Sequence, residues 1–571
     1  MSQDQRNRSR NWKLTALGLA GFGAAMVGGS ACSLVLSFDE CSADSDCAFS
    51  GGNGTCDNGV CTFSEGGDDV DTSGSGDTDT ADTEETATET TAGEACTAHT
   101  ECVALHTQTW VCGCDDTCIN ALTPQCQTIV WPDDTPQDNV VFVGSVMPIS
   151  PPFDTLVLPL QNSMQLALED FNDETQLPGG QKIAWVGCDS VGGTMAVGAA
   201  IHLVDNICVP AIVGPVFSEA TIAVAEQVTI PGGVFTITPT ASSKKITNLV
   251  DDDLVWRPIA SDIYQANALA DRLEIMAQPG DNIVIVNKND EYGNGLTMDA
   301  FAQAGAVDIT DVFAYDVQLD PMAPIVDIED HIANTLFTDG GANPPEIIVL
   351  VGTSEVQAFV LGYLQAISVM EPPPYPRFVF THGAVPSMPD LIKHPLVIGD
   401  DATQMLLYAT LEGMAPVIFD EQNFAAFNTR YMLKFQDQNA ITTSSLSYDS
   451  ALVVLLAASG IPDGEPVTGA NIAAQMGRLV DSSGTFISFG PEIDTTFIKT
   501  AVNVLSTGGS VDLKGISGEL EFDLETGDVR TGLIGWEPTP INDNLDTPTI
   551  TPRRIYTLDP EPAVDGSWTD L

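Results

Sequence analysis

The sequence predicts an α/β protein with two lobes, each built on a doubly wound parallel β-sheet. From about residue 139, short apolar runs alternate with amphipathic segments, which is the order of strands and helices in such sheets. The runs are apolar throughout, as strands covered on both faces are. This pattern fills about 400 residues, which is more than one sheet usually holds, so we expect two lobes.

Each expected strand is a run rich in Val, Ile or Phe. The runs are Val140–Val143, Ile183–Val186, Ala211–Val213, Val234–Ile237, Ile283–Val286, Ile347–Val351 and Phe378–Phe380. Between the first two, apolar residues recur at helical spacing at Met164, Ala167, Leu168 and Phe171. The apolar stretch 451–460 is too short to cross a bilayer and predicts a buried helix.

The composition excludes whole classes of function. The 571 residues carry 79 Asp and Glu against 20 Lys and Arg, a formal charge of −59. Such a surface repels phosphate backbones and anionic lipid headgroups, so neither nucleic-acid binding nor polybasic membrane docking is expected. Gly-x-Ser-x-Gly and His-Glu-x-x-His are absent, and the six His are scattered. We therefore expect no enzyme, no cofactor and no metal.

Residues 1–31 have the features of an export signal. Four cationic residues precede an uncharged apolar segment from Leu14 to Val27, and small residues lead to Cys32. Small residues followed by Cys resemble the lipobox of bacterial lipoproteins, in which that Cys is lipidated, although Gly29 stands where the lipobox usually has Leu. The alternative is ordinary cleavage after Ala31, which leaves a free thiol.

Without Cys32, twelve cysteines remain, an even number that suits disulfides in an oxidising compartment. Residues 32–61 and 96–130 are expected to be two small Cys-rich knots, and zinc is the less favoured alternative because the spacing fits no paired Cys-x2-Cys signature. Between them, residues 62–95 carry eleven acidic residues and no Lys or Arg. Like charges repel and little can be buried, so a disordered linker is predicted.

The stretch Ala211–Ser243 is the most informative for function. One expected strand ends at Gly214-Pro215 and leads to Ser218 before a helix, and the next ends in Thr238-Pro-Thr240-Ala241-Ser242-Ser243. In open α/β sheets, ligands bind beyond the carboxyl ends of the strands. Hydroxyls and helix N-terminal amides there suit a carboxylate. The alternative for Ser218 is a plain helix cap.

At this point the sequence resembles a family. The run GPVFSEAT…ITPTASS is similar to the signature of type I periplasmic binding proteins, in the leucine/isoleucine/valine-binding group of ABC transporter substrate receptors. Further pieces follow in the family's order, over about residues 139–536: Arg257 with Asp262 and Gln265-Ala266, Tyr292-Gly-Asn-Gly295, Glu346–Gly352, Phe380–Gly383, Leu411–Gly413, Tyr448-Asp449 and Gly518–Asp523.

The resemblance implies two lobes joined by three crossovers, with a small ligand trapped between them by hinge closure. Lobe 1 would be residues 139–258 and 411–510, and lobe 2 residues 259–410 and 511–558. The ligand residues carried over by the resemblance are Ser218, Thr240, Ala241, Ser242, Tyr292, Thr353 and His382. The alternative for Tyr292 is a tyrosine that merely packs beside a glycine turn.

His382 departs from the family's pattern, because amino-acid-binding members have a Glu there that pairs with the ligand ammonium. A neutral imidazole accepts from an ammonium, whereas a protonated one favours an anion; a purely structural His is the alternative. Cys188 and Cys208 are left in the body, and parity predicts a bridge between them.

The favoured function is therefore an exported solute receptor, anchored by lipid at the periplasmic or cell-surface side, that delivers an amino acid or related molecule to an ABC transporter. The alternative is a sensor or surface interaction protein with the same fold. The acidic linker and the two Cys-rich knots favour this alternative, since ordinary solute receptors carry no such stalk.

Overall fold

The computed structural model describes residues 93–571, except 152, 194, 306, 317–343, 417–420, 437, 490–492 and 561–562, together with short strands between residues 48 and 62. The chain divides into two compact units, residues 1–89 and 90–571. The expected export signal, Cys32 and most of the acidic linker lie outside the described residues. In the first unit, β3 (Thr55–Asp57) pairs with β4 (Val60–Thr62), which places Cys56 opposite Cys61.

Lobe 1 is built on a sheet whose strands run in the order β12-β11-β10-β8-β9-β7. Each strand predicted here is present, as β8 (Val140–Met147), β9 (Lys182–Asp189), β10 (Ala211–Val213) and β11 (Phe235–Ile237), and β12 (Val255–Trp256) extends the sheet. These five strands are parallel. The sequence did not indicate β7 (Cys126–Val130), which pairs antiparallel with β9 at the edge.

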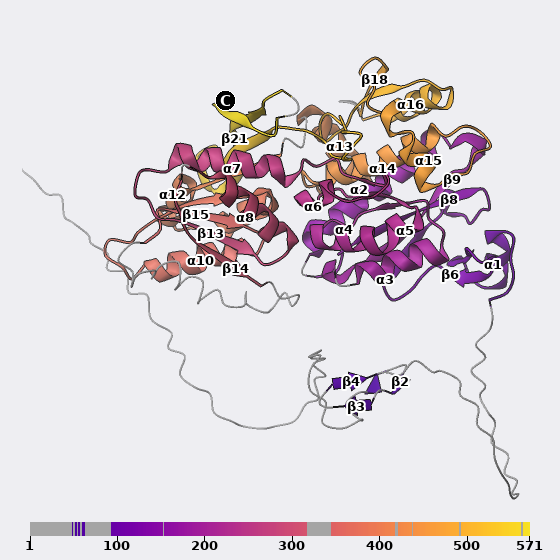
Figure 1. The fold of residues 1–571 in the computed structure, drawn as a ribbon, viewed down its shortest axis with the longest axis horizontal. Helices are drawn as coiled ribbons and strands as arrows, with labels where there is room; N and C mark the ends of the chain where they lie inside the picture. The colour runs from indigo at the N-terminus through magenta and orange to yellow at the C-terminus, as the bar shows by residue number, and fades with distance from the viewer. Residues whose placement is uncertain are drawn as a thin grey trace, which may run out of the picture. The chain divides into compact units, whose positions relative to one another are not determined.

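Successive residues of the lobe 1 strands face opposite layers, as the strand period of two requires. Val143 and Met147 of β8 pack with α2 (Asp154–Glu174) and α14 (Ser444–Ser459). Phe142 and Val146 pack on the other side with α3 (Ala196–Ile201) and α4 (Ser218–Val224). The sheet is thus covered by helices on both faces, and the doubly wound prediction is confirmed (Figure 1).

Lobe 2 repeats this plan with the order β14-β13-β15-β16-β17-β20-β21-β22. Its parallel strands are β13 (Ile283–Lys288), β14 (Ile309–Tyr315), β15 (Ile347–Val351), β16 (Arg377–Phe380) and β17 (Leu411–Pro416). Helices α7 (Asp262–Met276) and α8 (Glu291–Gln303) pack on one face, and α10 (Val356–Ile367), α11 (Met388–Lys393) and α12 (Asp401–Thr410) on the other.

The carboxyl-terminal part adds strands that the sequence analysis missed. β20 (Leu533–Ile541) pairs antiparallel with β17 and β21 (Asn544–Leu558), and β22 (Gly566–Asp570) closes the edge. Asn542 and Asp543 form the two-residue turn between β20 and β21, and both have positive φ. Asn and Asp tolerate that left-handed backbone, and such turns match the twist of a hairpin.

The chain passes between the lobes after Trp256, after Pro416 and after Lys514. Two expected boundaries shift as a result. Residues 411–416 belong to lobe 2, because β17 pairs in parallel with β16. Residues 511–514 belong to lobe 1, because β19 (Val511–Lys514) pairs with β18 (Thr485–Ser488) and packs with α16 (Thr496–Ser506).

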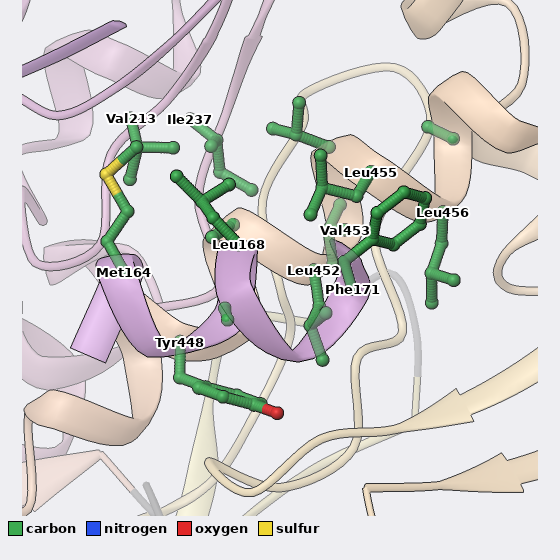
Figure 2. Close-up of a cluster of buried hydrophobic side chains, with 14 of the residues drawn as sticks. Met164, Leu168, Phe171, Val213, Ile237, Tyr448, Leu452, Val453, Leu455 and Leu456 are labelled. Carbon is green, nitrogen blue, oxygen red and sulfur yellow. The ribbon is translucent and has the colours of Figure 1, made fainter. Parts of the chain in front are cut away.

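The centre of lobe 1 is the contact between α2 and α14 (Figure 2). The predicted stripe Met164, Ala167, Leu168 and Phe171 is buried there against Leu452, Leu455 and Leu456. Every residue of α14 is buried, which confirms the buried helix expected from the apolar stretch 451–460. Among the residues that the structure describes, no helix has both the length and the apolar character that a membrane crossing requires.

Disulfides join the second Cys-rich segment to lobe 1, and this corrects the expected pairing. Cys188 and Cys208 do not bond to each other: Cys188 bonds to Cys126 and Cys208 to Cys114. Two further bridges in the described part of the chain are Cys96–Cys112 and Cys102–Cys118. Residues 96–130 are therefore not a self-contained knot. An even number of cysteines is compatible with the expected pairing and with the observed one. The register of β7 on β9, which places Cys126 opposite Cys188, distinguishes them.

The disulfide Cys114–Cys208 should stabilise the protein more than Cys96–Cys112, because it joins residues 94 apart rather than 16 apart. In the chain-entropy model, this difference in loop length corresponds to about 1.5 kcal/mol. We expect the double variant Cys114→Ala/Cys208→Ala to lose that much more free energy of unfolding than Cys96→Ala/Cys112→Ala, measured by urea denaturation. Equal losses would show that the longer bridge adds no constraint.

Candidate functional site

A cavity of about 110 Å³ lies where the strand ends of the two lobes face each other. It is lined from lobe 1 by α2, the loops after β10 and β11 and the segment before α14, and from lobe 2 by the loops after β13, β15 and β16. The lining residues are Leu156, Val157, Leu160, Val216, Phe217, Ser218, Thr240, Ser242, Lys288, Asp290, Tyr292, Thr353, His382, Gly383, Ile441 and Thr443.

The position of this cavity follows from the strand orders. In lobe 1, β9 lies on one side of β8 and β10 lies on the other. In lobe 2, β14 lies on one side of β13 and β15 lies on the other. Loops after neighbouring strands therefore leave in opposite directions and open a crevice at the carboxyl ends, which is where α/β sheets bind ligands. In lobe 1 this point lies between β8 and β10, and in lobe 2 between β13 and β15.

The lobe 1 wall carries three of the predicted hydroxyls. The Oγ of Ser218 accepts a hydrogen bond from the Ser243 amide at 3.1 Å, so its own hydrogen remains available. The Oγ1 of Thr240 donates to the Val216 carbonyl at 2.8 Å and keeps its lone pairs. The Oγ of Ser242 is buried and has no hydrogen-bond partner among the described residues.

Ser218 is not the helix cap that was its alternative interpretation. The cap of α4 is Phe217, and Ser218 is the first helical residue. Ala241 is buried in the same loop but is not among the residues that line the cavity. Its amide donates to Thr238 Oγ1 at 3.2 Å, and its carbonyl accepts from Arg257. The structure thus places six of the seven predicted ligand residues at the cavity wall and the seventh directly behind it.

Arg257 holds the loop that carries Thr240 and Ser242. This guanidinium is fully buried, and its Nη1 donates to the carbonyls of Ala241 and Ser243 at 3.2 and 2.9 Å. Its Nε and Nη2 donate to the two oxygens of Asp528 at 2.6 and 3.0 Å. Asp528 follows the last passage of the chain from lobe 1, so one ion pair fixes both the loop and a crossing segment.

Tyr292, Thr381, His382 and Gln265 form an uncharged network in the lobe 2 wall. Tyr292 donates its hydroxyl hydrogen to Thr381 Oγ1 at 2.8 Å, and its ring meets that of His382 edge-on at 5.2 Å. The Nδ1 of His382 lies 3.0 Å from Gln265 Oε1. Burial lowers the pKa of His382 to about 4, so the imidazole is uncharged at neutral pH. Thr353 donates to the Glu355 carboxylate.

Sequence reasoning missed the charged and apolar residues of the wall. Lys288 pairs with Asp290 at 2.8 Å, and its ammonium lies 5.3 Å from the centre of the Phe217 ring, which belongs to lobe 1. Aliphatic side chains from α2 and Ile441 complete the surface. The Lys288–Asp290 pair directly follows a predicted strand, and that position was the available signal. The aliphatic residues resemble any helix stripe, so no local signal marked them.

Polar contacts also join the lobes beside the cavity. α6 (Lys244–Thr247) lies in lobe 1 and faces α8 of lobe 2. Lys244 pairs with Asp299 at 3.3 Å, Lys245 pairs with Glu291, and Ser243 Oγ donates to Glu291 at 3.3 Å. Exposed pairs of this kind are each worth about 0–1 kcal/mol. These contacts therefore add little to the free energy that holds the two lobes together.

A second and more open hollow of about 550 Å³ lies elsewhere on lobe 1. Its lining includes His99, Asn139, Val140, Cys208 and Asp463. Asn139 and Val140 stand where β8 begins, so this hollow is at the amino ends of the parallel strands. It is remote from the strand-end loops and includes none of the predicted ligand residues, so size alone does not make it the functional site.

Replacing Arg257 should damage both the fold and the cavity. Arg257→Met leaves Asp528 buried without its partner, and breaking a buried ion pair costs about 3–5 kcal/mol. The matched control is Arg553→Met, because Arg553 is half-exposed and lies 3.6 Å from Glu537, so its loss should cost at most about 1 kcal/mol. Chemical denaturation measures both. A similar cost for the two variants would contradict the role given to Arg257.

Comparisons with known proteins agree with this geometry. Residues 140–389 match the family model described as periplasmic binding protein. No curated protein matches the sequence. Among solved structures, the leucine binding protein LivK from Thermotoga maritima is 16% identical and has a TM-score of 0.51, with 73% of this chain and 98% of that chain covered.

Two further solved structures extend the likeness. The branched-chain amino acid transporter substrate binding protein LivJ from Streptococcus pneumoniae, in complex with isoleucine, is 17% identical with a TM-score of 0.50, covering 72% of this chain and 99% of that one. A fatty acid ABC transporter substrate-binding protein from Thermomonospora curvata is 14% identical with a TM-score of 0.52, covering 73% and 92%. At these identities the likeness concerns the fold. The predicted resemblance is thereby confirmed: residues 140–389 match the periplasmic binding proteins, and the two-lobed body has the type I periplasmic binding protein fold of ABC transporter substrate-binding proteins.

Proposed function

We propose that this protein is an extracytoplasmic receptor that captures a small solute between its lobes and delivers it to an ABC transporter. The observation that carries the proposal is the cavity between the lobes, where six residues expected from the sequence meet. The cavity volume of about 110 Å³ suits an amino acid or a molecule of similar size. The wall contains hydroxyls and apolar side chains, which is the usual composition of a small-molecule site.

Each residue has a role in the proposed site. Ser218 donates its free hydrogen to a ligand carboxylate, and Thr240 and Ser242 offer oxygens to a ligand ammonium. Tyr292 and His382 close the site from lobe 2, and Thr353 completes that wall. The aliphatic residues of α2 and the ring of Phe217 surround an apolar side chain. The site binds and releases its solute, and no catalytic step is part of the proposal.

Lipid anchoring completes the proposed function. The family places its members outside the cytoplasm, and the disulfides of residues 96–208 suit an oxidising compartment. Cys32 would carry the lipid, and the acidic residues 62–95 would separate the receptor from the membrane. The supporting observation is the sequence before Cys32, which combines a cationic start, an apolar segment and small residues.

A thermal-shift screen of the full chain against amino acids, small amides and organic acids tests solute capture. A solute at 100 times its dissociation constant adds about 2.7 kcal/mol to the free energy of unfolding. We expect a hit, and we expect Ser218→Ala to weaken it about tenfold or more, because a hydrogen bond to a charged group is worth about 1.5–3 kcal/mol. Ser354→Ala is the control, since Ser354 is absent from the cavity lining. A hit that Ser218→Ala leaves unchanged would remove this site from consideration.

Cell fractionation tests the anchor. With Cys32→Ser, the lipid attachment site is lost, and we expect the protein to move from the membrane fraction to the soluble exported fraction. Mass spectrometry of the mature amino terminus of the unmodified chain should identify a lipidated Cys32. A Cys32→Ser protein that stays with the membrane and keeps its signal segment would instead show that an uncleaved helix is the anchor.

A further inference from the structure

One disulfide in the described part of the chain lies at the surface. Both residues of Cys114–Cys208 are exposed. Each of the three other bridges there has at least one buried cysteine: Cys96–Cys112, Cys102–Cys118 and Cys126–Cys188. A thiol breaks a disulfide by direct attack on one of its sulfur atoms, so the rate depends on access. Cys114–Cys208 is therefore, among these bridges, the one most open to thiols in solution.

The backbone at Cys208 is held in a conformation that side chains disfavour. Its φ is 63°, in the left-handed region that few residues other than Gly, Asn and Asp adopt. Its neighbours Ile207 and Val209 are buried, and the Val209 amide donates to the Leu203 carbonyl at 3.1 Å. Cys208 thus projects from a loop that is fixed on both sides of it. Breaking the bridge removes the covalent tie of this residue and lets its backbone relax.

The segment that carries Cys114 is also held on lobe 1 by apolar contacts. Cys114 lies in the turn between β5 (Trp110–Cys112) and β6 (Cys118–Asn120). Val111 of this hairpin and Ala121 directly after it are fully buried, in a core that includes residues of α3 and α4. Reduction of a disulfide leaves such apolar burial in place. Opening the bridge is therefore a local change, after which the two sulfurs remain near enough to rejoin.

We propose that Cys114–Cys208 is a redox-sensitive clasp between the Cys-rich segment and lobe 1, which a dithiol reductant opens while the rest of the fold persists. Cys208 lines the hollow of about 550 Å³ at the amino ends of the lobe 1 strands. Opening the clasp frees one wall of that hollow. The cavity between the lobes lies at the opposite ends of the strands and is unchanged, so the clasp acts independently of solute capture.

Opening takes two exchange steps. A thiolate of the reductant attacks one sulfur of the clasp, the bond between Cys114 and Cys208 breaks, and a mixed disulfide forms while the other cysteine leaves as a thiolate. The second thiol of the reductant then attacks the mixed disulfide, releases the remaining cysteine and closes the reductant's own disulfide. Two electrons pass to the cysteine pair, and the reductant's two thiols supply the two protons that the freed cysteines take up.

Charges beside the clasp decide which reductant reaches it. Asp115 and Asp116 directly follow Cys114, Asp205 lies shortly before Cys208, and all three carboxylates belong to exposed residues. At this spacing they act within the Debye length of about 10 Å at 0.1 M salt, and they repel an anionic thiolate. The partner that fits is a dithiol protein with a basic face around its thiols, because that face is attracted to the acidic surface before exchange begins.

Reduction of the full chain by dithiothreitol tests the clasp directly. Samples taken over time are blocked with N-ethylmaleimide, and peptide mapping by mass spectrometry measures the labelling of each cysteine. We expect Cys114 and Cys208 to be labelled together, at least about tenfold faster than Cys126 and Cys188, because access limits the rate. The latter two cysteines are fully buried and serve as the internal control. Equal or slower labelling of the clasp would overturn the proposal.

Hydrogen exchange separates a clasp from a bridge that the whole fold requires. The variants are Cys114→Ser/Cys208→Ser, which is permanently open, and the matched control Cys96→Ser/Cys112→Ser. We expect faster amide exchange in the open variant over residues 113–117 and 204–209, and unchanged exchange in β8 and β9. Reoxidation of the reduced unmodified chain with oxidised glutathione should restore slow exchange. Faster exchange throughout lobe 1, or no change in the two loops, would overturn the proposal.

Thiols of opposite charge test the basic partner. Cysteamine carries an ammonium, and 2-mercaptoethanesulfonate carries a sulfonate. We expect cysteamine to attack the clasp at least about tenfold faster per thiolate in about 0.01 M salt, and the ratio to fall towards one in about 1 M salt, where the Debye length is about 3 Å. Asp205→Asn should lower the low-salt ratio, whereas Asp252→Asn, at an exposed residue outside the lining of the hollow, should not. A ratio that does not change with salt would overturn the basic partner.

Discussion

The buried ion pair between Arg257 and Asp528 is the interaction on which the rest of the structure depends. A guanidinium without access to water must satisfy its donors inside the protein, and Arg257 does so with one carboxylate, two carbonyls and the Thr247 hydroxyl. Those carbonyls belong to the loop of Ala241 and Ser243. The polar face of that loop is therefore fixed towards the cavity by a residue that does not line it.

This arrangement links binding to the joint between the lobes. Arg257 stands where the chain first leaves lobe 1, and Asp528 stands on the last crossing segment. In the proposed function, a solute that orders the loop of Ser242 would thereby act on both crossings. The contacts of Lys244 and Lys245 with α8 lie beside the same loop and add a weaker, exposed contribution. In the proposed function, closing of the lobes and solute capture would thus involve one continuous set of residues.

Much of the fold could be predicted from the sequence because its strands are buried on both faces. Such strands appear as uninterrupted apolar runs, so the seven runs were found, and Met164 to Phe171 identified α2. The antiparallel strands β7 and β20–β22 escaped, since they mix polar with apolar residues. Of these, β7 and β22 also lie at sheet edges. The lobe boundaries shifted because β17 and β19 are short strands beside crossings, where local sequence does not say which sheet they join.

Site residues could be predicted where polar side chains follow the end of a strand. They could not be predicted where their position depends on packing. Ser218, Thr240, Ser242 and Tyr292 directly follow apolar runs, and the strand order brings them together. The pairing of the cysteines depends on register and distance, so parity led to the wrong partner for Cys188.

The residues of the second Cys-rich segment show how a small, weakly apolar region is kept ordered. A segment of this length buries too little to fold alone, and disulfides to Cys188 and Cys208 make it part of lobe 1.

The most direct test of solute capture between the lobes is a crystal structure of the full chain grown with the most stabilising solute of the screen. We expect that solute to lie between the lobes, in contact with Ser218, Ser242 and Tyr292. A solute bound elsewhere, with these three side chains left untouched, would contradict it.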